Sequence, residues 1–259
     1  MRCSWFSLLK LGFIALAIFA QSCQSTTTNK KEAASLRLEI VGSLIRAGNY
    51  PTALKELRIA EQEDPTNPFV QAFLGYVYFL REKYDASENH YLQALKLKSD
   101  YPEARTDLAR TYIEMGRYVK AEAQLKQALD DLTFVKYHKA QAMLGVLEFK
   151  RKNFTAAQEY LKKALEKDRE DCPINVYLGR SYTEGQDTKM AIQQLEKSMA
   201  FCSLSESDEA HYYSAIALFR DNQADKAQTR FEEQLKLFPN GYYSEKAGKM
   251  IDIIKRGRL

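Results

Sequence analysis

Apolar and small residues recur along this chain at helical spacing, and the whole pattern repeats with a period of 34 residues. Each copy carries Leu, a small residue and Tyr in a first segment, then two small residues flanking a large one in a second. The clearest copies are Leu74, Gly75, Tyr78, Ser87, Tyr91 and Ala94; Leu108, Ala109, Tyr112, Ala121, Leu125 and Ala128; and Leu178, Gly179, Tyr182, Ala191, Leu195 and Ser198. Spacings of three and four residues place side chains on one helix face. A period of this length predicts an all-α solenoid, a scaffold that holds a partner rather than an enzyme.

Six copies of the pattern are found between residues 34 and 240. They begin near Ala34, Pro68, Pro102, His138, Cys172 and Asp208, so the third and fifth copies are 36 residues long. After them, the stretch from Tyr242 to Lys255 carries apolar residues on one helical face and lysines on the other. We expect residues 241–259 to form a capping helix and tail that cover the last copy.

The first 22 residues have the composition of a secretory signal. Arg2 and Lys10 precede a short apolar run, Leu11 to Ala20. This run is shorter than the roughly 20 residues that a membrane span needs. An ordinary signal peptide and an uncleaved anchor are both compatible with this pattern. The run ends in Ala20-Gln21-Ser22-Cys23, which resembles a bacterial lipobox, although Gln21 departs from the usual small residue.

The lipobox resemblance implies cleavage before Cys23 and acylation of that cysteine. The polar residues that follow favour this interpretation, because a tethered domain needs a solvated leash, here residues 23–33. Gln24 after the cysteine resembles lipoproteins sent to the outer membrane. The expected location is therefore the outer membrane, with the protein lipid-anchored and facing the periplasm.

Charge and motif content argue against other classes. Removing residues 1–22 takes away two of the 38 basic residues and leaves 36 against 34 acidic residues, too even a balance for a nucleic-acid binder. His90, His138 and His211 fall in separate copies, without metal-ligand spacing, and solvent-facing or helix-start positions are expected for them. No phosphate loop or nucleophile elbow is present. We expect no catalytic residue, cofactor, metal or small-molecule substrate.

Two cysteines remain after Cys23. Cys172 opens the first segment of the fifth copy and Cys202 follows its second segment, so an antiparallel hairpin brings them to the same end. A disulfide there is the favoured interpretation for an oxidising compartment, and two buried thiols are the alternative.

These slots resemble the tetratricopeptide-repeat family, down to the prolines Pro65 and Pro239 at the end of copies one and six. The resemblance implies a right-handed superhelix whose concave side is lined by slots 2, 5, 9 and 12 of each first helix. Apolar groups at these slots predict a groove for a helix or extended segment of a partner, although some belong to the core instead. The strongest candidates are Leu38, Ile45, Phe69, Tyr76 and Phe79; further ones are Ile113, Val146, Phe149, Tyr212, Ile216 and Phe219, mixed with Arg110 and Arg180.

Six repeats, a cap and a lipidated leash together resemble the type IV pilus pilotins, the PilF/PilW/Tgl-like lipoproteins. The two-residue lengthening before Tyr137-His138 also fits that architecture. The resemblance implies binding of an outer-membrane secretin and promotion of its insertion and multimerisation. The alternative is another periplasmic tetratricopeptide adaptor, serving barrel assembly or tethering a peptidoglycan hydrolase.

Overall fold

The protein is built from helix pairs, without strands, throughout the residues that its computed structural model describes, 31–202 and 207–257. Each pair consists of two sequential antiparallel helices, and a last helix follows them, so the predicted all-α repeat array is confirmed. The signal segment, Cys23 and most of the leash lie outside the described residues. Contacts divide the chain into two compact units, one up to Thr111 and one from Tyr112.

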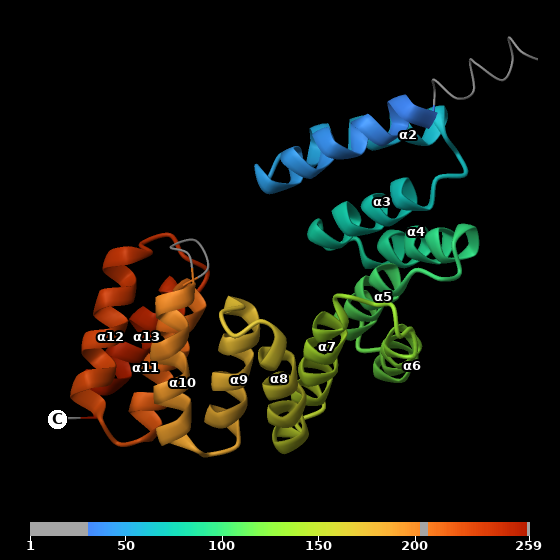
Figure 1. Cartoon of the computed structure of the whole chain (residues 1–259). Coiled ribbons are helices and arrows are strands. Elements are labelled where there is room, and N and C mark those ends of the chain that lie inside the picture. Colours follow the sequence, from blue (N-terminus) through green and yellow to red (C-terminus); the bar gives the residue numbers. More distant parts are fainter. Residues whose placement is uncertain (1–30, 203–206, 258–259) are drawn as a thin grey trace, which may run out of the picture. The chain divides into compact units, whose positions relative to one another are not determined.

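Unit 1 contains the first two repeats and most of the helix that opens the third (Figure 1). Its elements are a helix over residues 31–46, α2 (Tyr50–Glu63), α3 (Pro68–Leu80), α4 (Tyr84–Leu97) and the greater part of α5 (Pro102–Glu114). Side-chain oxygens begin two of these helices: Asn49 accepts from the backbone N–H of Thr52, and Asn67 accepts from that of Phe69. Asn at the N-cap is a strong start signal because it satisfies an otherwise unpaired donor.

Unit 2 continues the same pattern to the C-terminal end (Figure 1). Its complete helices are α6 (Tyr118–Leu129), α7 (Tyr137–Lys150), α8 (Phe154–Lys167), α9 (Cys172–Glu184), α10 (Thr188–Phe201), α11 (Ser207–Arg220), α12 (Ala224–Leu237) and α13 (Ser244–Arg256). The turns between paired helices use left-handed backbone, supplied by Gly116 with φ 70° in one turn and by Lys152 with φ 64° in the next. None of the helices among the described residues is long and apolar enough to cross a bilayer.

Small residues at the repeat slots set how closely two paired helices approach. In repeat five, a Cβ on Gly179 would lie 2.4 Å from Cγ of Leu195, and in repeat four a Cβ on Gly145 would lie 2.6 Å from Cγ of Leu161. Both leucines are fully buried and flanked by buried small residues on their own helix. The leucine therefore occupies the space that a side chain on the glycine would need, which explains the Leu-Gly signature.

Helix α13 closes the C-terminal end of the array. Its apolar face, Ala247, Ile251 and Ile254, is buried and packs in one cluster with Phe231 of α12. Gln234, which replaces the usual small residue of its slot, is also fully buried. It donates to Asp208 at 2.7 Å, and the same carboxylate accepts from the backbone N–H of Tyr243 at 3.1 Å. This departure from the repeat pattern thus ties the cap to the last repeat.

A disulfide joins Cys172 at the start of α9 to Cys202 after the end of α10, with the two Cα atoms 5.0 Å apart. It links the N-terminal end of α9 to the C-terminal end of α10, which lie at the same end of repeat five. The loop that it closes spans a sequence separation of 30 residues.

Gly179→Ala should destabilise unit 2, because the new methyl group overlaps the fully buried side chain of Leu195, which has no free space to move into. Overpacking of this kind costs about 1–3 kcal/mol of unfolding free energy. Gly248→Ala in α13 is the matched control, since its Cβ would meet nothing within 4 Å. There the loss of glycine's backbone freedom should stabilise the helix by roughly 0.5–1 kcal/mol. Urea unfolding of both variants measures the two effects. Changes in unfolding free energy of the same sign in both variants would contradict the packing argument.

Reducing the Cys172–Cys202 bond should lower the free energy of unfolding, because the open chain regains loop entropy on unfolding. For a separation of 30 residues the chain-entropy account gives about 3–4 kcal/mol. Urea unfolding with and without a phosphine reductant tests this. A Cys172→Ser/Cys202→Ser double variant should match the reduced protein and ignore the reductant. Identical midpoints for the oxidised and reduced wild-type protein would contradict the expectation.

Candidate protein-binding surface

One face of α3 carries a row of aromatic side chains in unit 1. Phe69, Tyr76 and Phe79 are spaced by seven and three residues, which places them on the same side of the helix. Phe69 is exposed, and Tyr76 and Phe79 are half-buried, while Leu74 and Val77 on the opposite side are in the core. The structure thus brings together the three aromatic members of the predicted groove, which we call the aromatic row.

Cationic side chains from the following elements lie over the aromatic row. Lys98 places its Nζ 5.4 Å from the ring centroid of Phe69, and the Arg110 guanidinium lies 5.8 Å from Tyr76 and 5.3 Å from Phe79. Both arrangements are cation–π contacts. Cationic groups therefore border the aromatic rings of the row.

An acidic neighbour holds Arg110 in this position. Its guanidinium donates to Oδ1 of Asp107 at 2.6 Å. Burial lowers the pKa of Arg110, but Asp107 and the tyrosines Tyr91 and Tyr76 raise it further, so the net shift is upward. The guanidinium consequently stays charged over the rings at any physiological pH.

The other two predicted groove residues of unit 1 are placed differently. Leu38 and Ile45 are half-buried and pack against the core cluster of repeat one, which includes Val41, Leu57 and Leu74. They complete the hydrophobic surface between the first helix and α3 but contribute partly to the core. Their role in binding a partner stays a prediction, as does that of the aromatic row.

Two of the further concave-slot residues belong to the core instead. Ile113 and Val146 are 2% and 5% exposed, so the expectation that they line an accessible surface is wrong. Val146 lies in α7, which packs against both α8 and α9. Phe149, Tyr212, Ile216 and Phe219 remain half-buried.

A second arginine, Arg180 of unit 2, is enclosed by aromatic rings. The Arg180 guanidinium lies 4.8 Å from the centroids of Phe149 and Tyr177 and 4.4 Å from that of Tyr213. It also donates to Glu209 at 2.7 Å, and the hydroxyl of Tyr243 donates to the same carboxylate oxygen at 3.0 Å. Helices α7, α9 and α11 are thus held together through one half-buried cation.

Arg110 and Arg180 follow one rule that the sequence pattern contains. Each occupies slot 9 of its repeat, and each lies over the phenylalanine at slot 12 of the repeat before, Phe79 or Phe149. The signal is a Phe followed by an Arg 31 residues later, and it occurs in both units. This Phe–Arg pair is not apparent from the apolar slots alone.

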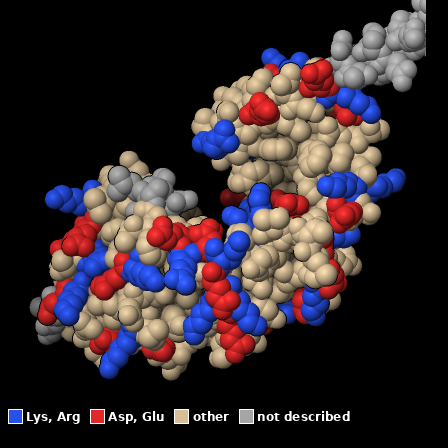
Figure 2. Space-filling view, in the orientation of Figure 1, with Lys and Arg blue, Asp and Glu red and all other residues tan. Residues whose placement is uncertain are grey.

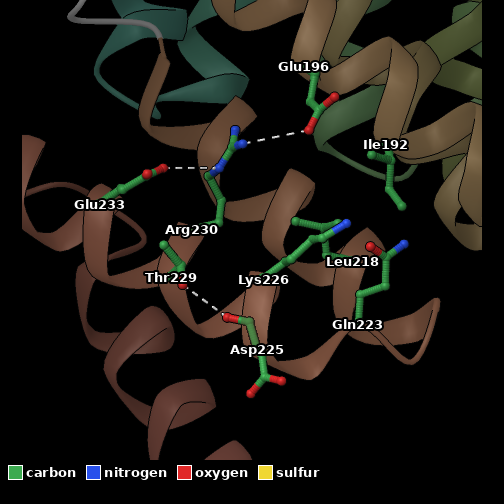
Figure 3. A pocket seen from close by; sticks show the side chains of 9 residues that line it. All are labelled: Ile192, Glu196, Leu218, Gln223, Asp225, Lys226, Thr229, Arg230 and Glu233. Carbon is green, nitrogen blue, oxygen red and sulfur yellow. Dashed lines mark hydrogen bonds and ion pairs between the residues drawn. The ribbon is translucent and has the colours of Figure 1, made fainter.

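A cavity in repeats five and six is lined mainly by polar and charged side chains. It has a volume of about 490 Å³ and lies among α10, α11 and α12, with Ile192 and Leu218 as its apolar residues (Figure 3). Arg230 spans it and pairs with Glu196 at 3.6 Å and with Glu233 at 3.2 Å. The visible face of unit 2 likewise interleaves acidic and basic groups, and that of unit 1 shows uncharged surface between scattered groups of both signs (Figure 2). The charged groups of the cavity therefore pair with one another.

The three histidines are half-buried or buried, and His138 lies at a helix start, as expected. Among the described residues no cluster of His, Cys, Asp and Glu has the arrangement of a metal site. His138 begins α7 and is buried. His90, expected at the surface, is half-buried in α4 because it stacks on the ring of Tyr78, with centroids 5.3 Å apart.

His90 ends a polar chain that crosses three helices. Arg58 of α2 pairs with Glu61 at 2.9 Å, Gln71 of α3 donates its amide to Glu61 at 2.9 Å, and the amide oxygen of Gln71 lies 2.8 Å from Nδ1 of His90. Because that oxygen can only accept, Nδ1 of His90 carries the proton. Burial, followed by the charge of Arg58, lowers the pKa of His90.

Comparison with known proteins assigns the class. Sequence models described as tetratricopeptide repeat match residues 38–104, 78–144 and 138–171. Together with the helix pairs and their slots, these matches show that the chain is a tetratricopeptide-repeat protein. It is also 28% identical over 127 residues to Hsp70-Hsp90 organizing protein 2 of Arabidopsis thaliana, a match that covers 49% of this chain and 22% of that protein.

Solved structures of several tetratricopeptide proteins share the fold. PilW, a widely conserved type IV pilus biogenesis factor, matches with a TM-score of 0.72 and 18% identity over 82% of this chain and 97% of its own. Pseudomonas aeruginosa PilF matches with a TM-score of 0.67 and 18% identity over 84% and 97%. The Cut9–Hcn1 assembly of the APC/C matches with a TM-score of 0.75 and 17% identity, over 86% of this chain and 43% of that chain. At these identities the comparison shows the fold alone.

The lowered pKa of His90 predicts an acid-sensitive unit 1. The unfolded chain binds this proton more readily, so the stabilising contribution is complete above the unfolded pKa of about 6.5 and is lost as the pH falls below it. His90→Gln keeps a donor for Gln71 but cannot titrate. Between pH 7 and pH 5 the wild type should therefore lose more unfolding free energy than the variant, as measured by urea unfolding. His138, whose pKa is also lowered, is present in both proteins. Parallel losses would contradict the role given to His90.

Proposed function

We propose that this protein is an outer-membrane-tethered chaperone of the pilotin type, which binds a pilus secretin and promotes its insertion and multimerisation. The observation that carries the proposal is the aromatic row of α3 with Lys98 and Arg110 over it. A segment bound for the membrane exposes apolar surface while it is in water, and such a surface needs a cover. Tetratricopeptide scaffolds provide that cover by binding segments of other proteins.

The charge of the row sharpens the partner's chemistry. Aromatic rings bind apolar side chains, and the ammonium of Lys98 favours acidic ones, whereas Arg110 is already paired with Asp107. An amphipathic segment with an apolar and an acidic face matches both the rings and Lys98. A neutral or basic segment would leave the attraction to Lys98 unused.

The N-terminal segment supports the tethered part of the proposal. Under it, Cys23 carries acyl chains, which hold a protein firmly to a bilayer once two or more are present. The similarity in fold to PilF and PilW covers nearly the whole of both those chains, which fits the same architecture. A general tetratricopeptide adaptor for another periplasmic partner is the competing assignment.

Deleting the gene should abolish the heat-resistant secretin multimers of the outer membrane. The measurement is an immunoblot of unboiled and boiled membrane fractions. Secretin monomers accumulating in the inner membrane would agree with the proposal, and multimers at the normal level would overturn it. A host genome without any secretin would overturn it too.

Phe69→Asp/Tyr76→Asp should lose the multimers while the protein itself remains folded and membrane-bound, because the two carboxylates repel an acidic segment and remove its apolar cover. Leu92→Asp is the matched control. It is an apolar-to-acid change on unit 1 at a side chain 44% exposed, close to the 43% of Phe69, but on α4. We expect the control to assemble multimers normally. Normal assembly in the double variant, with deletion still abolishing it, would reject the aromatic row and leave the function standing.

A further inference from the structure

The first helix, residues 31–46, exposes two large apolar side chains that nothing among the described residues covers, beside the exposed carboxylates Glu32 and Glu39. Leu36 and Ile40 stand one helical turn apart and are 58% and 51% exposed. Elsewhere two exposed apolar residues would be ordinary. Here they lie at the end of a repeat array, where a capping element with a polar outer face is the rule.

The opposite side of this helix contacts its own repeat. Ala34 and Val41 are fully buried in the core of repeat one. Arg37 faces α2 and donates to Glu56 at 2.6 Å and to Glu63 at 2.8 Å. These contacts fix the rotation of the helix, so the side with Leu36 and Ile40, which we call the outer face, is held away from its own repeat.

The chain's own preceding residues are poor candidates to cover the outer face. Residues 24–30 read Gln-Ser-Thr-Thr-Thr-Asn-Lys, without an apolar side chain. Their polar groups would lose water on packing against Leu36 and Ile40 and gain no hydrogen bonds in return. The cover must therefore come from outside this segment.

Chain length identifies what lies nearby. Eight residue steps separate Cys23 from Lys31, which at full extension span no more than about 29 Å and as a flexible coil average about 16 Å. Leu36 and Ile40 follow about 8 and 14 Å further along the helix. If Cys23 is acylated, as the proposed function holds, the outer face stays within reach of the headgroups at all times.

We propose that the outer face of the first helix docks on the surface of the membrane that holds the acyl anchor, with Leu36 and Ile40 entering the headgroup region. The contact is small, but the anchor already confines the protein, so a weak interaction is enough to orient it. A second copy of the chain is a less suitable occupant. Stable pairs bury about 800 Å² on each partner, far more than two side chains offer. Docking would place the N-terminal end of unit 1 against the membrane.

The chain provides a clean spectroscopic test. Its single tryptophan, Trp5, lies in the segment that lipoprotein processing removes, so the mature protein has none. Leu36→Trp then reports on the outer face alone. As the acylated protein in phosphatidylethanolamine/phosphatidylglycerol vesicles, it should show blue-shifted emission and strong quenching by lipids brominated near the headgroup. Leu132→Trp, at a position 99% exposed, is the matched control and should emit as in water.

Each outcome has one meaning. A blue shift confined to Leu36→Trp supports docking. Emission typical of water at both positions overturns docking. If mass spectrometry then shows that Cys23 is acylated, the lipid anchor still stands. Equal shifts at both positions overturn the assignment to this face. A concentration-dependent shift without vesicles would identify a second copy as the occupant. A chain that is not acylated overturns docking and the tethered part of the proposed function together. The role in secretin assembly is tested separately, by the secretin multimers.

Discussion

The close approach of two helices within each repeat is the constraint on which the rest of this structure depends. A buried leucine of one helix fills the space where its partner has glycine, as Leu195 does beside Gly179. That contact fixes the spacing of a pair, and pairs of equal spacing stack. Stacking in turn aligns the first helices of neighbouring repeats, so that side chains 31 residues apart in sequence come into contact.

Alignment of the first helices gives the protein its surface chemistry. Phe79 and Arg110 meet in unit 1, and Phe149 and Arg180 meet in unit 2, because their slots are superimposed by the repeat. The two sites differ in how the arginine is satisfied. Arg180 is wrapped by three rings and a carboxylate, whereas Arg110 lies beside an aromatic row that remains partly open. The same local rule thus makes a structural fastener in one unit and a candidate recognition surface in the other.

The period predicted the fold well because each slot answers a local packing requirement. Repeat starts at Pro68, Pro102 and Cys172 are also helix starts. Surface properties were harder to predict, since exposure depends on what a neighbouring repeat places over a slot. Val146 was expected at the surface but is buried in α7, which packs against both α8 and α9. Lys98 has no slot at all, and its position over Phe69 depends on how the chain leaves α4.

Solenoids of this kind are held by contacts between neighbours, so an array loosens from its ends inward one repeat at a time. The bridge between Cys172 and Cys202 changes this for repeat five, whose two helices cannot separate at their outer ends. A pull on the C-terminus passes from Cys202 across the S–S bond to Cys172, so the chain between the two cysteines bears no tension. Mechanical load from that side therefore bypasses the two helices of repeat five and acts next on repeat four.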